Sequence, residues 1–193
     1  RTVDNIADND EELEVKKNNL LVFKNDFLNK NYNNIIIKNM WDLMDHHLIS
    51  IKIIKDLFDG VESDLSKKVQ LNNKKDLLIY SYRVAGTVGL MMAKILNVKG
   101  DNSMKAAIDL GIAMQLTNIS RDIVEDSKVN RFYIKNDFET IRDTLALADL
   151  FYKSSFLAIN KIPFKFRFAI LVARRVYKKI GDKILKTKNI ENY

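Results

Sequence analysis

The feature that most constrains this chain is a polar stripe inside an otherwise apolar segment, residues 111–133 (GIAMQLTNISRDIVEDSKVNRFY). Side chains three and four residues apart share one face of a helix. The polar residues recur at those spacings: Gln115, Asn118, Asp122, Glu125 and Asp126. An apolar period runs beside them through Ile108, Ile112, Leu116, Ile119 and Ile123. This pattern predicts a buried helix whose carboxylates face a cavity.

Carboxylates crowded in this way raise each other's pKa values unless water or a cation stabilises their charges. Mg²⁺ accepts carboxylate and amide oxygens, with waters and substrate phosphates completing its shell. The alternative is a solvated acidic face paired with the neighbouring cations Arg121 and Lys128. A second acidic pair near the start of the chain, Asp4 and Asp8, is one helical turn apart and favours the metal site.

Composition limits the remaining possibilities. A chain of 193 residues is one domain by the usual prior, and with six Gly, one Pro and 47% apolar residues it can be helical almost throughout. The absence of Cys excludes thiolate catalysis and Cys-ligated zinc, and it favours a reducing compartment, so we expect a cytoplasmic location. No apolar run approaches the roughly 20 residues of a membrane-spanning helix, and no signal peptide opens the chain.

The net charge of +7 does not by itself indicate a nucleic-acid partner. Lys and Arg are spread along the chain instead of clustering with aromatic residues in a recognisable binding module. We therefore expect no nucleic-acid binding, although a positive field would help to gather a polyanionic substrate.

Helical periodicity covers most of the chain. It predicts helices over residues 20–28, 34–49, 51–67, 76–96, 103–127, 137–159 and 164–185, with no strands. Ser103 is a plausible N-cap for the acidic helix. The adjacent His46 and His47 point in different directions and do not form a paired metal site. Because the chain starts inside an apparent helix, we expect it to be a single domain over residues 1–193 that is truncated at its N-terminus and also at its C-terminus.

Small residues interrupt the apolar segment 76–96 (DLLIYSYRVAGTVGLMMAKIL). Gly86 and Gly89 weaken a helix and can kink it. The space they leave could form an apolar groove suited to a long hydrocarbon, or it could allow two helices to pack tightly. The last helix is basic, which is typical of a solvated face and, less strongly, of a helix at a membrane surface. Its cations are Arg174, Arg175, Lys178, Lys179, Lys183 and Lys186.

Four motifs in one order resemble the squalene and phytoene synthase family: DNIAD at 4–8, YSYRVAGTVGLM at 80–91, NISRDIVED at 118–126 and NRFY at 130–133. The likeness extends to about Leu185, through RRVYKKIGDKIL. Either acidic motif alone would be a weak signal, but the ordered combination is specific. The resemblance implies an all-α fold, the class I prenyltransferase (isoprenoid synthase) helical bundle, with two acidic motifs facing each other across a central cavity.

The resemblance also implies roles for individual residues. Mg²⁺, or Mn²⁺ in its place, would be held by Asp4 and Asp8 from one wall and by Asn118, Asp122 and Asp126 from the other. Residues implied to contact diphosphate or brace the acidic motifs are Arg1, Gln115, Arg121 and Arg131. The implied wall along the prenyl chains comprises Tyr80, Val84, Gly86, Val88 and Gly89. Tyr82 and Tyr133 match aromatic positions near the reacting centre. Asn5 departs from the pattern, because many relatives have a second adjacent aspartate there.

The implied reaction joins two prenyl diphosphates head to head through a cyclopropylcarbinyl diphosphate intermediate. The motifs are nearest to the bacterial phytoene-forming branch, which would use two geranylgeranyl diphosphates in carotenoid biosynthesis and need no NADPH. The alternatives are a squalene, dehydrosqualene or hydroxysqualene synthase using farnesyl diphosphate, or a non-catalytic relative acting as an assembly factor. Release of an apolar product would suit a peripheral contact with the inner face of a membrane.

Overall fold

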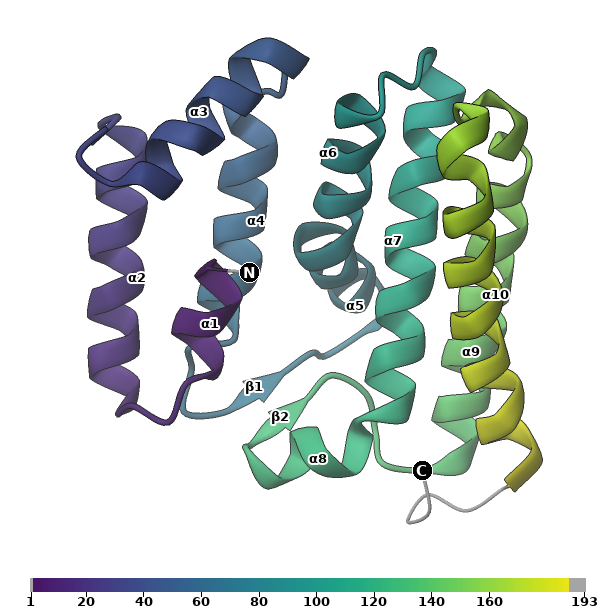
Figure 1. Cartoon of the computed structure of the whole chain (residues 1–193). Coiled ribbons are helices and arrows are strands. Elements are labelled where there is room, and N and C mark those ends of the chain that lie inside the picture. Colours follow the sequence, from purple (N-terminus) through teal and green to yellow (C-terminus); the bar gives the residue numbers. More distant parts are fainter. Residues whose placement is uncertain (1, 188–193) are drawn as a thin grey trace.

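The computed structural model describes residues 2–187, and these residues are almost entirely helical, which confirms the all-α prediction. Figure 1 shows α1 to α4 on one side, α5 to α7 in the middle, and α9 and α10 on the other side. The α-helices are α1 (Thr2–Asp8), α2 (Leu13–Leu28), α3 (Ile35–His47), α4 (Ile51–Ser63), α5 (Lys74–Ser81), α6 (Thr87–Ile95), α7 (Asp101–Arg121), α8 (Ile123–Lys128), α9 (Phe138–Phe156) and α10 (Phe164–Thr187).

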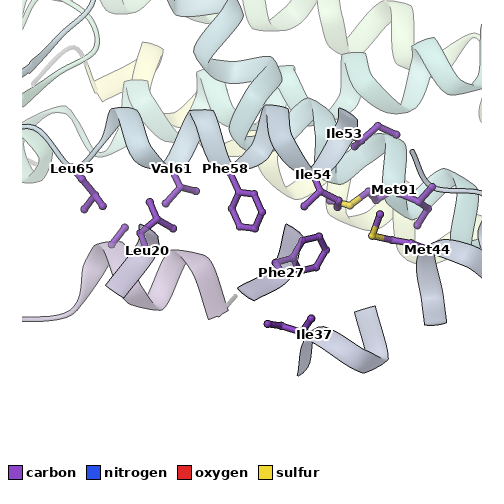
Figure 2. Close-up of a cluster of buried hydrophobic side chains, with 12 residues drawn as sticks. Leu20, Phe27, Ile37, Met44, Ile53, Ile54, Phe58, Val61, Leu65 and Met91 are labelled. Carbon is purple, nitrogen blue, oxygen red and sulfur yellow. The ribbon is translucent and has the colours of Figure 1, made fainter. Parts of the chain in front are cut away.

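The first core lies among α2, α3 and α4 (Figure 2). The ring of Phe27 stacks on Trp41 with centroids 5.5 Å apart and meets Phe58 edge-on at 5.6 Å. The Asn34 side chain caps α3 by accepting a hydrogen bond from the Ile36 N–H. Ala7 of α1 is buried against the same cluster, so this core fixes where the first acidic motif lies.

The second core surrounds α7, which packs against α5, α9 and α10. Ile112, Leu116 and Ile119 are buried, as the apolar period predicted. The hydroxyls of Thr117 and Tyr152 lie 3.0 Å apart and join α7 to α9. The helix that carries the polar stripe is therefore fixed in place by the packing of its apolar face.

The acidic helix differs from the prediction at both ends. It begins at Asp101 after Gly100, whose φ is 88°, so Ser103 is a buried helical residue and not the N-cap. It breaks at Asp122 (φ −94°, ψ 13°), where α7 gives way to α8. The Asp122 N–H still bonds to the Asn118 carbonyl, and the Asp126 N–H bonds to the Asp122 carbonyl, both at 2.8 Å. The spacing of the polar stripe thus continues through the break.

Two short strands correct the prediction that the chain has none. β1 (Val69–Gln70) pairs in parallel with β2 (Arg131–Phe132), with Val69 opposite Arg131. Because α4 ends at Ser63, the segment expected to stay helical to residue 67 instead leads into β1. Figure 1 shows the pair beneath α1 and next to α8, so it brings residue 131 beside the first acidic motif.

The expected helix 76–96 contains a π-helical turn, η1 (Tyr82–Gly86), between α5 and α6. Close helix packing explains its glycines. A Cβ on Gly89 would lie 2.2 Å from the Ala107 carbonyl oxygen, and one on Gly111 would lie 2.3 Å from the Ala85 carbonyl oxygen. The missing side chains let the backbones of η1 and α6 touch α7 directly.

We predict that Gly111→Ala destabilises the protein, because its Cβ would meet backbone that cannot rotate away. The cost is about 1–3 kcal/mol, the usual range for overpacking a core. Gly181→Ala is the matched control within a helix, since its Cβ would meet only the Leu145 Cδ2 at 3.2 Å. That control should be neutral or stabilising by up to about 1 kcal/mol. Denaturant unfolding measures both, and equal stabilities for the two variants would contradict the packing argument.

Candidate active site

An arginine from the segment after the second acidic motif pairs with the first motif. Both terminal nitrogens of Arg131, in β2, donate to Asp8 Oδ1 at 3.2 Å. Asp8 ends α1, and Asp4 lies one turn earlier on the same helix; both side chains are exposed. The first motif therefore meets the segment that directly follows the second one. The predicted role of Arg1 lies outside the described residues.

The second motif shows the expected crowding of negative charge. Burial and the neighbouring Asp122 carboxylate raise the pKa of Asp126 to about 6. Arg131 opposes that rise in pKa, whereas Asp64 and Glu125 add to it. Asp126 is thus costly to ionise in the protein alone, which is the property expected of a group that meets a cation.

Asp122 has a partner already. Arg121 donates to it from Nε and Nη2, both at 2.6 Å, and the aspartate partner raises the pKa of Arg121. The sequence also allowed the polar stripe to be an acidic face paired with neighbouring cations. The pair of Arg121 with Asp122 is one such contact. Both side chains remain more than one third exposed, so the pair can rearrange around a ligand.

An apolar cavity of about 490 Å³ opens between η1, α6, α7 and α10. This volume is within the roughly 300–1,000 Å³ typical of small-molecule sites. Val84, Val88 and Gly89 line it as expected, whereas Gly86 faces Tyr82 and Ile108 instead. The sequence left two roles open for these small residues, tight helix packing and an apolar groove. Gly89 has both roles. The sequence did not identify the contribution of α10, which lines the cavity through Phe166, Ala169, Ile170, Ala173, Arg174 and Tyr177.

Gln115 and Asn118 are also on the wall of this cavity, about two turns and one turn before the break at Asp122. Asn118 Oδ1 is buried and has no hydrogen-bond partner within residues 2–187. A buried amide oxygen without a partner is costly, so it indicates a position where a ligand, water or cation would bind. Asn118 is therefore the residue of the second acidic motif that the apolar cavity reaches.

The three tyrosines singled out from the sequence are held by carboxylates outside the acidic motifs. Tyr80 and Tyr133 stack with centroids 4.7 Å apart, and each hydroxyl donates to Asp64 at 2.8 Å. Burial raises the pKa of both tyrosines. Neither is among the residues that line the apolar cavity. Tyr82 is separate, because its hydroxyl donates to Asp56 Oδ2 at 3.0 Å.

The residues fit a divalent cation, with one restriction. Among residues 2–187, no three acidic or imidazole side chains lie close enough to hold a metal ion on their own. The partnerless oxygen of Asn118 and the crowded carboxylate of Asp126 nevertheless supply donors of the type that Mg²⁺ accepts. Since Mg²⁺ usually keeps several waters and takes phosphate oxygens from its substrate, the protein need not provide the complete shell.

Comparisons with known proteins agree with this geometry. The squalene/phytoene synthase family matches residues 1–140. The 15-cis-phytoene synthase of Paracoccus sp. (strain N81106 / MBIC 01143) is 34% identical over 149 residues, which are 68% of this chain and 49% of that protein. The 15-cis-phytoene synthase of Pantoea ananas is 35% identical over 150 residues, 67% of this chain and 48% of that one. The chain thus spans about half the length of these relatives.

Two solved structures share the fold. A squalene synthase of Alicyclobacillus acidocaldarius superposes with a TM-score of 0.81 at 15% identity, covering 96% of this chain and 79% of that one. A dehydrosqualene synthase in complex with ligand gives a TM-score of 0.76 at 25% identity, covering 98% and 76%. The fold is therefore the helical bundle of the isoprenoid synthases, as predicted. Within that class, the chain belongs to the squalene/phytoene synthase family.

We predict that Asp126→Asn stabilises the cation-free protein above about pH 6. The raised pKa means that ionising Asp126 opposes folding, and this cost is fully present above the folded pKa of about 6. The cost disappears as pH falls toward 3.8, the ordinary pKa of an aspartate side chain. The gain should be about 1–2 kcal/mol at high pH after allowance for solvent screening.

The free energy of unfolding, measured in chelator at about pH 8 and about pH 4, tests this pH dependence. Glu125→Gln is the control, since this side chain is exposed on the same helix and should change stability by less than about 0.5 kcal/mol at either pH. A destabilised Asp126→Asn protein at high pH would contradict the crowding.

Proposed function

We propose that this chain provides the catalytic core of an Mg²⁺-dependent enzyme that condenses two prenyl diphosphates head to head, through a cyclopropylcarbinyl diphosphate. One observation carries the proposal: the wall of the apolar cavity includes Gln115 and Asn118, and Asn118 belongs to the second acidic motif. A prenyl diphosphate has the same two parts, an apolar chain and a polyanionic end. A cavity with both characters can orient such a molecule.

In this proposal, Asp4, Asp8, Asn118, Asp122 and Asp126 would hold the cations. Bound Mg²⁺ would neutralise charge on the diphosphate as the allylic C–O bond breaks. Arg131 and Arg121 would release their present carboxylate partners in part and turn toward the diphosphate oxygens. The apolar wall formed by Val84 and Val88 would keep water from the allylic cation until the double bond of the second chain attacks it.

Geranylgeranyl diphosphate is the proposed substrate, and phytoene the proposed product, in carotenoid biosynthesis. The support is the similarity to 15-cis-phytoene synthases at 34% and 35% identity. Such a reaction ends with loss of a proton, so no NADPH is needed. A squalene-type reaction with farnesyl diphosphate is the second candidate, supported by the 25% identical dehydrosqualene synthase.

The test is to express the complete reading frame, supply farnesyl or geranylgeranyl diphosphate with Mg²⁺, and identify the products by mass. We expect a C40 hydrocarbon from geranylgeranyl diphosphate and no turnover after chelation. A clear preference for farnesyl diphosphate would move the assignment to the squalene-type reaction. No product from either substrate would favour a non-catalytic relative.

The variant Asp122→Asn tests whether the second acidic motif is responsible for that activity. Turnover should fall by about 10²-fold or more, the usual effect of removing a group that stabilises developing charge. Asp143→Asn is the control, because that carboxylate is exposed on α9 and pairs with the adjacent Arg142 at 3.1 Å. Unchanged turnover in Asp122→Asn would refute its proposed role at the metal.

We also propose a peripheral membrane contact through α10, at the cytoplasmic face that the absence of Cys suggests. Within residues 2–187, no helix combines the length and apolar character needed to cross a bilayer. An exposed apolar stripe nevertheless follows α10 at four-residue spacing: Phe164, Phe168, Val172 and Val176. Arg174 and Lys178 bind Tyr152 and Asp149 of α9. The exposed cations Arg175, Lys179, Lys183 and Lys186 remain at the surface of α10.

Flotation with vesicles of phosphatidylglycerol and phosphatidylcholine tests the membrane contact. The double variant Phe164→Ser/Phe168→Ser should bind at least about tenfold more weakly, because each buried Phe contributes about 1.5–3 kcal/mol. Leu21→Ser/Val22→Ser on α2 is the control, since these residues are also exposed. Equal binding by both double variants would exclude α10 as the contact surface.

A further inference from the structure

We propose that Asp64 is a positioning residue for the prenyl coupling, acting as the shared acceptor that holds the hydroxyls of Tyr80 and Tyr133 together between the two acidic motifs. The inference rests on the proposed function and adds a residue to it. Asp64 follows α4 as its C-cap and is outside both acidic motifs.

Both carboxylate oxygens of Asp64 are hydrogen-bonded to buried tyrosines. Its Oδ2 accepts from Tyr80 and its Oδ1 from Tyr133, each at 2.8 Å, and the two phenol oxygens lie 3.0 Å apart. Tyr80 and Tyr133 are 6% and 7% exposed, so water does not compete freely for these bonds. Each oxygen of the carboxylate accepts one hydroxyl, so this single side chain holds both phenols.

The pairing joins parts of the site that are far apart in the sequence. Tyr80 is in α5, directly before the π-helical turn whose Val84 lines the apolar cavity. Tyr133 comes two residues after Arg131, which holds Asp8. By holding the two tyrosines, Asp64 fixes the cavity wall relative to the arginine between the motifs.

The same geometry argues against Asp64 as another metal ligand. Both of its oxygens already accept short hydrogen bonds, and breaking them would leave two buried hydroxyls without partners. Its influence on the reaction would instead pass through the alignment of the tyrosines. A misplacement of about 1 Å in an active site can reduce the rate by about 10²-fold.

The test uses the enzyme from the complete reading frame, with kcat expressed per folded molecule. Asp64→Asn keeps the shape, but its amide nitrogen cannot accept a hydrogen bond. The hydroxyl that faces this nitrogen loses its carboxylate acceptor and must rotate toward the other phenol oxygen, 3.0 Å away. We expect kcat to fall by about 10- to 100-fold. The Mg²⁺ concentration for half-maximal activity should stay within about twofold, because no cation ligand is removed.

A double-mutant cycle separates positioning from a general loss of structure. Tyr80→Phe/Tyr133→Phe should reduce kcat to a similar extent, and adding Asp64→Asn to it should change kcat by less than about threefold, since groups acting as one unit are not additive. Glu62→Gln is the matched control. It is two residues away, more than half exposed, and pairs with Lys24, so its kcat should equal that of the wild type.

Three results would overturn the proposal: wild-type kcat in Asp64→Asn, fully additive losses in the cycle, or a loss of activity that high Mg²⁺ restores. The hydrogen-bonded unit can be tested separately by near-ultraviolet circular dichroism. Asp64→Asn must alter the tyrosine band and Glu62→Gln must not. If the wild-type enzyme condenses no prenyl diphosphate, the proposed function fails, whereas an unaltered tyrosine band refutes the unit itself.

Discussion

The ion pair between Arg131 and Asp8 is the contact on which the site depends. It joins a helix at the start of the chain to a strand that follows the second acidic motif, and the two partners are 123 positions apart in the sequence. Burial lowers the pKa of Arg131, but Tyr133, Asp64 and Asp8 together outweigh burial, so that its pKa is raised. One guanidinium thus balances several carboxylates, and without it the two acidic segments would repel each other across the same region.

Two structural features fix the position of Arg131. The parallel pair β1 and β2 sets Arg131 opposite Val69, and the two tyrosines bound to Asp64 lie directly beside it. The apolar cavity has a separate cause, the close contact of α6 with α7 at Gly89 and of η1 with α7 at Gly111. The polar and apolar halves of the site therefore have separate structural causes, and they meet at Asn118.

Much of the fold could be predicted from the sequence because its cause is local. The 3.6-residue period of α7 gave its buried face, and Ile112, Leu116 and Ile119 are buried as expected. The break at Asp122 was not predictable, because helical hydrogen bonds continue across it and the pattern of residues is unchanged. The strands were missed because two residues are too few to show alternation. The π-helical turn was foreseen only as a weak point near Gly86.

The candidate site also contains residues that the sequence pattern reveals and residues that it does not reveal. The aspartates of each acidic motif are four residues apart, which is one helical turn, so Asp8 and Asp126 could be selected from the sequence. Asp64 could not, because its partners are 16 and 69 residues away and one acidic residue in a polar segment has no distinguishing pattern. The lining contributed by α10 was hidden for a similar reason, since Phe166 and Ile170 resemble ordinary core residues.

The central claim is that the two acidic motifs share cations bound to a diphosphate. Crystals of the complete protein grown with Mn²⁺ and a non-reactive thiodiphosphate analogue of a prenyl substrate test it directly, through anomalous diffraction at the manganese edge. The account predicts anomalous peaks between α1 and α8, within coordination distance of Asp8 and Asp126, and a prenyl chain in the cavity beside Val84 and Val88. Manganese bound elsewhere, or an analogue whose diphosphate lies away from Asn118, would contradict it.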